Sequence, residues 1–314
     1  MRTRAAVALL AGVVICIGAP TASAARSSRA PRTAPSRTAR ERTAPSTYSV
    51  IEVPDVLYST PVPGTNTYLD VYEPDATGPF PGVVAVHGGG YRDGGNRKGQ
   101  IALDASNLAA EGFVTYAIDY RSACNPRRPP PGTDPSLCGF TAPAPEHDIR
   151  TAIQWVRTNA TTYDTDPTHV GVFGVSTGGT YANMATIDGT AGADRGDAVV
   201  AWSGEGDLTY QPDGSRAVYI GCAYTVCPKK WDKNSPTFVV QATSAPLYLS
   251  GGEYDPQVAF AVEKAEIDRY TSLSVPNQWH MLYGVKCHAR GCVDVDPSIW
   301  TESVAWFHMW LDPS

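Results

Sequence analysis

A serine flanked by glycines is the sharpest chemical signal in the sequence. The segment Gly174-Val175-Ser176-Thr177-Gly178-Gly179 follows an apolar run and precedes a segment of helical character, the context in which a G-x-S-x-G turn exposes a nucleophilic serine. Side chains beside the serine would clash with neighbouring backbone in so sharp a turn, which accounts for the glycines. The start of the following helix would direct free N–H groups toward an oxyanion. The pattern predicts that Ser176 attacks a carbonyl group; a plain glycine-serine turn is the alternative.

A second glycine-rich segment precedes this one in the chain. His87-Gly88-Gly89-Gly90 directly follows the apolar run Gly82–Val86. Glycine lets the backbone approach a substrate closely, so N–H groups here could bind a carbonyl oxygen as it becomes an oxyanion. One such donor typically contributes about 10²–10³ in rate. A simple glycine turn is the alternative, and the order of the two motifs argues against it.

With these two motifs the chain resembles the α/β-hydrolase fold, and specifically the secreted esterases and carboxylesterases related to the hormone-sensitive-lipase branch. The resemblance runs from about Val50 to Leu311 and includes Asp119-Tyr120-Arg121, Pro145–Asp148 and Gly252–Asp255. Two segments depart from the branch pattern. The serine turn reads Val-Ser-Thr rather than Asp-Ser-Ala, and Arg121 is followed by Ser-Ala-Cys rather than Leu-Ala-Pro.

The resemblance implies one α/β domain, a mostly parallel twisted sheet with helices on both faces and two long loop insertions. By position it implies that Ser176 is the nucleophile and that the N–H groups of Gly88, Gly89 and Thr177 form the oxyanion hole. It implies no metal and no organic cofactor.

The acid of such a site is expected after a late strand, because the chain order in this fold is serine, acid, histidine. Asp255 follows the predicted strand Pro246–Ser250 and is the candidate acid. It could equally cap a helix that starts at Pro256, and both roles could hold at once. Asp207 is the second choice and Glu253 the third.

Two histidines compete for the role of base. His280 lies inside the predicted strand Gln278–Val285, where the pleat fixes its direction, whereas His288 lies just beyond the strand. A catalytic imidazole must face the serine with one nitrogen and a carboxylate with the other, which favours His288. We expect structural roles for the remaining histidines, His87, His147, His169 and His308.

The cysteines predict disulfides. Cys16 lies in the N-terminal segment and six others remain; their even number suits an oxidising compartment, although 15 connectivities are possible. Local pairing is the simplest arrangement, and one pair would close a ring around His288. Zinc is the rival interpretation, but the sequence contains no C-x₂-C pair. The expected pairs are Cys124 with Cys138, Cys222 with Cys227, and Cys287 with Cys292.

The N-terminal segments predict secretion. Residues 1–24 combine Arg2 and Arg4, a short apolar run and an Ala-Ser-Ala end, as a signal peptide does; the run is too short to span a membrane. Residues 25–47 are rich in Ser, Pro and Arg and predict a flexible basic leader. It could contact anionic cell-wall polymer, but a solvated linker is the simpler interpretation.

The charge of the chain is unevenly divided. Residues 1–47 hold eight of the 25 Lys and Arg and one of the 31 Asp and Glu, which leaves 17 basic and 30 acidic side chains and a net charge of −13 in residues 48–314. Such an acidic body without a basic stripe is a poor nucleic-acid binder, and we expect a monomer acting on a small or polymer-linked ester.

Alternating strands and helices must position these side chains, in one catalytic domain over residues 48–314. Two long stretches, Arg121–Pro145 and Ser203–Thr243, interrupt the alternation. The expected strands are Val50–Tyr58, Tyr68–Tyr72, Gly82–Val86, Phe113–Ile118, His169–Val175, Ala198–Trp202, Pro246–Ser250 and Gln278–Val285. The expected helices are Lys98–Glu111, Glu146–Asn159, one after Ser176, Pro256–Thr271 and Ser298–Leu311.

Other side chains carry weaker signals. Glu146 and Asp148 open a helix, where acids complement the dipole. Asp294 and Asp296 are a weak indication of a cation site. Aromatic side chains near the strand ends could line an acyl pocket or belong to the core: Tyr91, Tyr120, Trp202 and Trp231.

The resulting prediction is a secreted serine esterase that works through an acyl-enzyme. Feruloyl or acetyl esters of plant polymers, small acyl esters and polyesters are all compatible with it. A serine peptidase or amidase with the same residues is one alternative. A non-catalytic hydrolase-like binding protein is another, although no member of the expected triad is missing.

Overall fold

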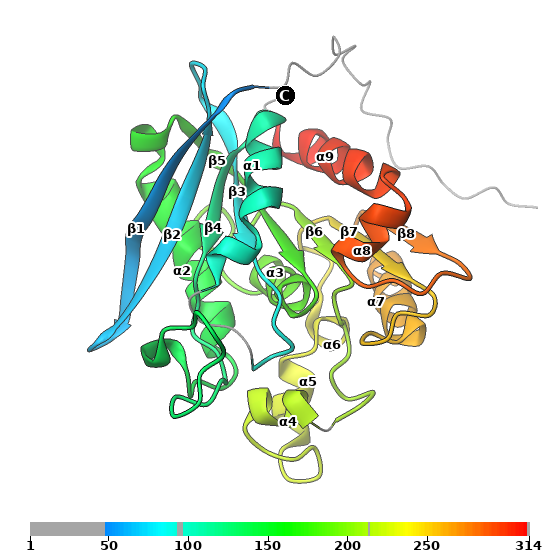
Figure 1. The fold of residues 1–314 in the computed structure, drawn as a ribbon. Coiled ribbons are helices and arrows are strands. Elements are labelled where there is room, and N and C mark those ends of the chain that lie inside the picture. The colour runs from blue at the N-terminus through cyan, green and yellow to red at the C-terminus, as the bar shows by residue number, and fades with distance from the viewer. Residues whose placement is uncertain (1–47, 93–96, 213, 313–314) are drawn as a thin grey trace, which may run out of the picture. The chain divides into compact units, whose positions relative to one another are not determined.

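The described part of the chain forms an eight-stranded sheet. The computed structural model describes residues 48–92, 97–212 and 214–312. The strand order is β1-β2-β4-β3-β5-β6-β7-β8 (Figure 1). Strand β2 pairs antiparallel with β1 and with β4, and the later pairings are parallel. The strands are β1 (Val50–Val62), β2 (Thr65–Pro74), β3 (Phe80–Val86), β4 (Val114–Ile118), β5 (Thr165–Val175), β6 (Val199–Trp202), β7 (Leu247–Gly252) and β8 (Asn277–Leu282).

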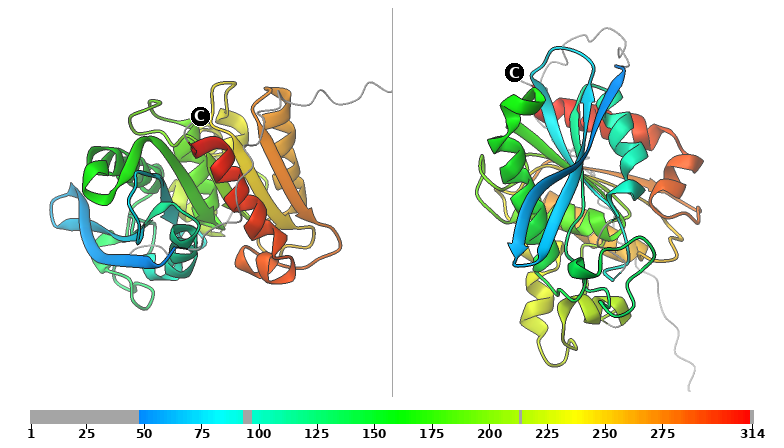
Figure 2. Two further views of the ribbon diagram at one scale, coloured as in Figure 1. Left: turned by 90° about the horizontal axis from the view of Figure 1, so that it is seen from above. Right: turned by 60° about the vertical axis from the view of Figure 1, so that its left-hand side comes forward.

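Helices pack on both faces of this sheet, and Figure 2 gives two further views of the layers. One apolar cluster joins the sheet to α2, α3 and α7, and a second joins the opposite face to α1, α8 and α9. The helices are α1 (Ala102–Ala110), α2 (Ala144–Thr158), α3 (Thr177–Ile187), α4 (Gly214–Ile220), α5 (Pro228–Lys233), α6 (Pro236–Val239), α7 (Phe260–Ser272), α8 (Arg290–Val295) and α9 (Ser298–Leu311).

Strand β3 shows why the central strands have continuous apolar sequences. Val83 and Ala85 point into the cluster with α1 and α9. Val84 and Val86 point into the cluster with α2 and α3. All four side chains are fully buried, as expected of a parallel strand covered on both faces. The predicted mostly parallel sheet with helices on both faces is confirmed.

The structure adds short helices that were not predicted and corrects the start of a predicted one. The insertion after β6 contains the short helices α4, α5 and α6, and α8 was not predicted. Helix α7 begins at Phe260 and not at Pro256, because the Asp255 carboxylate accepts hydrogen bonds from the N–H groups of Gln257 and Val258 in a separate turn before the helix. The helices that were not predicted, α4, α5, α6 and α8, have four to seven residues and are too short to show a helical period in the sequence.

The six cysteines of the described region form disulfides between sequence neighbours. The bonds join Cys124 to Cys138, Cys222 to Cys227, and Cys287 to Cys292, the pairs that local pairing predicts. The first lies in the insertion between β4 and α2, the second between α4 and α5, and the third at the start of α8. The two insertions touch, because the N–H of Ala142 donates to the carbonyl oxygen of Tyr219.

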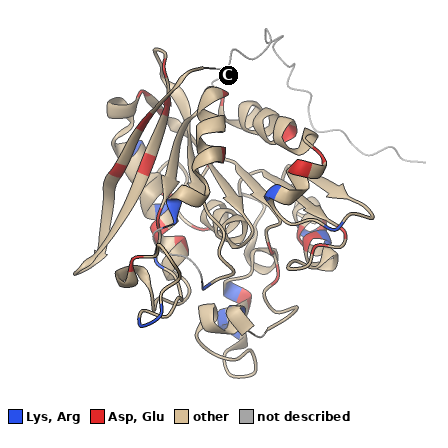
Figure 3. Ribbon diagram, in the orientation of Figure 1, with Lys and Arg blue, Asp and Glu red and all other residues tan. Residues whose placement is uncertain are grey.

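Two sequence predictions fall outside the described residues, namely the signal peptide (1–24) and the basic leader (25–47). Within the described chain, none of the helices has the length and hydropathy needed to cross a membrane. Acidic residues are distributed over several of its elements, among them β1, β2, α8 and α9 (Figure 3).

Candidate active site

Ser176 lies in the sharp turn between β5 and α3. Its backbone has φ 55° and ψ −128°, a positive φ that non-glycine residues rarely adopt. Its N–H donates to the carbonyl oxygen of Trp202, the last residue of the neighbouring strand β6, over 2.7 Å. The adjacent strand therefore helps to hold the strained residue in place.

The glycines around Ser176 are needed for close backbone contacts. A Cβ atom at Gly174 would lie 2.2 Å from the carbonyl oxygen of Gly178, and one at Gly178 would lie 2.3 Å from the carbonyl oxygen of Val86. A Cβ atom at Gly88 would lie 3.1 Å from the Cβ of Ser176. The turn before α3 and the loop after β3 are thus in direct contact.

The side chains of Ser176, His288 and Asp255 form a continuous hydrogen-bonded series. His288 Nε2 lies 2.8 Å from Ser176 Oγ, and His288 Nδ1 lies 2.8 Å and 3.0 Å from the two carboxylate oxygens of Asp255. With the proton of the neutral imidazole on Nδ1, Nε2 is free to accept the serine proton. The structure thus brings together the residues predicted as nucleophile, base and acid.

The carboxylate of Asp255 is held in its ionised form. Its side chain is fully buried, and burial alone would raise its pKa. Hydrogen bonds from His288 and from the N–H groups of Gln257 and Val258 outweigh burial, so that the pKa of Asp255 lies below its ordinary value. The carboxylate can therefore stabilise a positive charge on His288.

Three contacts fix the loop that carries His288. The disulfide between Cys287 and Cys292 brackets the histidine. The Cys287 sulfur fills the space of a side chain at Gly252, where a Cβ atom would lie 2.6 Å from it. The N–H of Ala289, which has φ 48°, donates to Ser203 Oγ over 2.8 Å. The histidine loop is therefore attached to the ends of both β7 and β6.

The loop after β3 has a backbone conformation that requires glycine, and it makes a contact with α3. Gly89 and Gly90 have φ of 149° and 56°, within the range that favours glycine. The N–H of Tyr91 donates to Thr177 Oγ1 over 3.2 Å, which ties the loop to the first turn of α3. Thr177 is the first residue of that helix, where an N–H has no partner within the helix.

The competing site residues lie elsewhere. His280 Nδ1 is 3.0 Å from Glu302 and its Nε2 is 3.4 Å from Asp296, so this histidine links β8 to the region of α8 and α9. Asp207 accepts hydrogen bonds from Thr209 in its own loop. Glu253 accepts a hydrogen bond from the N–H of Gly284.

The remaining predicted residues take part in local structure. His87 stacks on Tyr120, with ring centroids 4.3 Å apart, and His169 and His308 pair with Asp166 and Asp312. His147 lies on α2, as do Glu146 and Asp148, and Asp148 pairs with Arg121. The four aromatic side chains Tyr91, Tyr120, Trp202 and Trp231 are all buried. Asp294 and Asp296 lie on and after α8, and within residues 48–92, 97–212 and 214–312 no group of three or more His, Cys, Asp and Glu could hold a metal.

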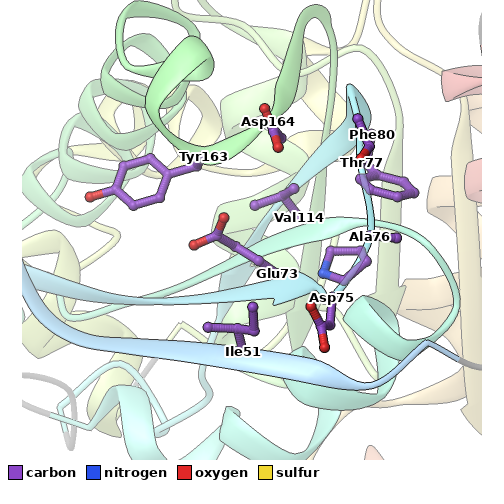
Figure 4. A pocket seen from close by; sticks show the side chains of 10 residues that line it. Ile51, Glu73, Asp75, Ala76, Thr77, Phe80, Val114, Tyr163 and Asp164 are labelled. Carbon is purple, nitrogen blue, oxygen red and sulfur yellow. The ribbon is translucent and has the colours of Figure 1, made fainter.

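A hollow of about 280 Å³ lies away from this site. Figure 4 shows Glu73, Asp164 and Phe80 among its lining side chains. Phe80 is the first residue of β3 and Asp164 directly precedes β5. The hollow is therefore at the opposite end of the central strands from Ser176, which follows β5.

Two contacts of the site had no sequence signal. Ser203, which supports the histidine loop, is 86 positions from Ala289. Tyr91 and Glu205, which share a hydrogen bond near the glycine loop, are 114 positions apart. Neither pair belongs to a recognisable motif.

Comparison with known proteins identifies a family and several relatives. The BD-FAE family matches residues 69–265. The probable carboxylic ester hydrolase LipM of Mycobacterium tuberculosis is 25% identical over 231 residues, which are 67% of this chain and 50% of that protein. Esterase LipC of the same organism is 26% identical over 218 residues, 63% of this chain and 50% of that protein. The chain spans about half the length of these curated relatives.

Solved structures share the fold. A truncated carbohydrate esterase from gut microbiota has a TM-score of 0.66 at 20% identity, covering 86% of this chain and 99% of that one. Esterase 2 of Thermogutta terrifontis, phosphoramylated by tabun, has a TM-score of 0.64 at 18% identity, covering 88% of this chain and 100% of that one. The fold is the α/β-hydrolase fold that the sequence motifs resemble.

Proposed function

The chain belongs to the BD-FAE family, and on that premise we propose that it is a serine esterase that hydrolyses carboxylic esters through an acyl-enzyme intermediate. The observation that carries the proposal is the 2.8 Å contact between Ser176 Oγ and His288 Nε2, together with the 2.8 Å contact between His288 Nδ1 and Asp255. Nucleophile, base and orienting carboxylate are thus in hydrogen-bond reach beside a glycine loop.

In the proposed reaction Ser176 Oγ attacks the ester carbonyl carbon while His288 Nε2 takes the hydroxyl proton. The negative charge that develops on the carbonyl oxygen is stabilised by the N–H groups of Gly88, Gly89 and Thr177. His288 then gives its proton to the leaving alcohol, and the acyl group remains on Ser176. A water molecule, deprotonated by His288, then attacks the acyl carbon. The bond to Ser176 Oγ breaks as His288 returns the proton to that oxygen, which releases the acid and restores the serine. Asp255 keeps the imidazole oriented and stabilises its charged form throughout.

The names of related proteins support the reaction class. Two curated relatives are called a carboxylic ester hydrolase and an esterase. The Thermogutta terrifontis esterase with the same fold is phosphoramylated by tabun, a reaction that an activated nucleophile carries out. We extend this reactivity to Ser176 of the present chain.

We further propose that the protein is secreted. Residues 1–24 have the composition of a signal peptide. The disulfides among the six cysteines of the catalytic domain suit an oxidising compartment. In this proposal residues 25–47 form a basic leader and residues 48–314 the catalytic domain.

Labelling with a fluorophosphonate probe tests the proposed function. The folded protein should be modified at Ser176, and Ser176→Ala should abolish both labelling and the hydrolysis of p-nitrophenyl acetate. Rates on a matched ester and anilide separate an esterase from a peptidase or amidase. Absence of labelling in the folded protein, or hydrolysis that survives Ser176→Ala, would overturn the proposal.

A further inference from the structure

Tyr91 occupies a strained position directly after the glycine loop. Its φ is 68°, a left-handed conformation that is unfavourable for a residue with a bulky side chain. The side chain is buried, and its ring packs against Tyr219 and Tyr181, with ring centroids 5.3 Å and 5.8 Å away. A strained residue persists only where its surroundings hold it, so the contacts of Tyr91 decide the shape of the loop before it.

Polar contacts hold Tyr91 at both its backbone and its hydroxyl group. The N–H donates to Thr177 Oγ1 over 3.2 Å. The hydroxyl donates to Glu205 Oε2 over 2.8 Å and lies 3.3 Å from Thr180 Oγ1. The N–H of Glu205 in turn donates to Thr180 Oγ1 over 2.9 Å. Tyr91 is therefore fixed to the first turn of α3 and to the chain that follows β6.

The carboxylate of Glu205 is paired with a cation from the insertion. Glu205 is 4% exposed, and its two oxygens lie 2.7 Å and 2.8 Å from Arg216 Nε of α4. Burial raises the pKa of Glu205, and the charge of Arg216 and the Tyr91 hydroxyl both oppose that rise. The guanidinium also donates to the carbonyl oxygen of Gln257, two residues after Asp255, over 3.3 Å.

These contacts link two parts of the candidate site. They start at the glycine loop, pass through Tyr91 to Glu205, continue to Arg216 and end at the loop that carries Asp255. Helix α4 is thereby attached to the site by an ion pair whose carboxylate is buried and whose arginine is partly exposed. A second contact, from the N–H of Ala142 to the carbonyl oxygen of Tyr219, holds the same helix from the other insertion.

We propose that Tyr91, Glu205 and Arg216 are positioning residues that hold the N–H groups of Gly88 and Gly89 in the arrangement that binds the oxyanion. The proposal rests on the proposed esterase function and deepens it. It assigns the insertion that carries α4 a role in supporting the oxyanion loop. These residues do not touch the reacting atoms. Because the N–H groups that they hold bind an oxyanion that forms only in the transition state, their loss should weaken transition-state binding more than substrate binding.

The test removes single hydroxyl groups from two tyrosines whose rings are in contact, Tyr91 and Tyr181. Tyr91→Phe deletes the hydroxyl that donates to Glu205 and is expected to lower kcat about tenfold with little change in KM, a part of the roughly 10²–10³ that a whole donor contributes. Tyr181→Phe is the matched control. It makes the same change in a neighbouring ring whose buried hydroxyl has no hydrogen-bond partner in the described structure, so kcat should stay at the wild-type value.

An inhibitor that mimics the transition state separates positioning from folding. A trifluoromethyl ketone adds reversibly to the serine and places an oxyanion in the same N–H groups. Its inhibition constant should rise in Tyr91→Phe by the factor by which kcat/KM falls, and should be unchanged in Tyr181→Phe. Thermal unfolding of both variants shows whether the fold is retained.

Variants of the ion pair complete the test. Glu205→Gln and Arg216→Ala should each reproduce the Tyr91→Phe effect, and the double variant Tyr91→Phe/Glu205→Gln should lose little more than either single one. Unchanged kcat and inhibitor affinity in Tyr91→Phe would overturn the proposal, as would equal losses in Tyr91→Phe and Tyr181→Phe. Fluorophosphonate labelling of wild-type Ser176 is unaffected by either outcome, so failure of this inference is distinct from failure of the esterase function.

Discussion

Removal of the disulfide next to His288 should differ from removal of the other disulfides in how strongly it affects activity relative to stability. The bonds Cys287–Cys292 and Cys222–Cys227 have the same sequence separation of 5. In the chain-entropy description, a closed loop of that size stabilises the folded state by about 2 kcal/mol. Replacing either pair by alanine should therefore lower the free energy of unfolding by a similar amount.

The effect on activity should differ between the two pairs. Cys287 is adjacent to His288 and its sulfur packs on Gly252, just before the loop of Asp255. Loss of this bond frees the histidine to move, and a displacement of about 1 Å can cost about 10²-fold in rate. We expect Cys287→Ala/Cys292→Ala to lower kcat by about 10- to 100-fold. Cys222→Ala/Cys227→Ala should lower it far less, because that bond lies after α4 and its loss leaves the pair of Arg216 with Glu205 in place.

The assay measures kcat and KM for p-nitrophenyl acetate well below the unfolding temperature of each variant, with urea unfolding run in parallel. Cys124→Ala/Cys138→Ala adds a stricter control, because its sequence separation of 14 predicts a larger loss of about 3 kcal/mol. That variant should be the least stable of the three and still turn over at the wild-type rate. Equal kcat values for all three double variants would refute the positioning role of the histidine ring.

Three further predictions concern the base, the glycine turn and a buried acid. His288→Ala should lower kcat/KM by roughly 10⁴-fold or more, while His280→Ala should leave it unchanged. If steady-state kinetics showed the reverse pattern, His280 would be the base and the assignment of His288 would be wrong. Gly178→Ala should destabilise the fold by more than about 3 kcal/mol, because its Cβ would lie 2.3 Å from a backbone carbonyl oxygen. Gly99→Ala is the control: the space around Gly99 is open, so this variant should change the urea midpoint of unfolding very little. Burial raises the pKa of Glu266 to about 8, so the folded protein keeps a proton that the unfolded chain releases above about pH 4.3. Stability should therefore fall as pH rises from about 5 to 8, and Glu266→Gln should flatten that dependence in urea titrations across this range.

The sequence was most informative where local structure determines a residue's position. The turn at Ser176 is specified by its own glycines and by the strand and helix on either side of it. Asp255 could be expected near the serine because it follows β7, whose carboxyl end lies at the same edge of the sheet as that of β5. For the histidines, a period of two along β8 turns His280 toward Glu302, and only a residue beyond that strand is free to reach Ser176.

Prediction was weakest where distant segments meet. The turn of Asp255 and Pro256 has the composition of a helix start, yet α7 begins only at Phe260, because the carboxylate faces His288 and caps its own short turn. The contact between Tyr91 and Glu205 spans 114 positions, and its partners are a common aromatic and a common acid. Such pairs depend on how the insertion packs on the sheet, and a local sequence pattern does not predict that packing.

The candidate site therefore has two kinds of support, which differ in how easily they should be lost. The serine turn leads into α3, a helix whose residues are all buried, so it can move only if the core opens. The histidine loop is held by one disulfide, by the packing of Cys287 on Gly252 and by the contact of Ala289 with Ser203. It is also held by the ion pair of Arg290 with Asp104, whose arginine side chain is 40% exposed. Because exposed ion pairs contribute little and regions with few buried contacts open first, the arrangement of His288 is the part of the site that depends most on covalent bonding.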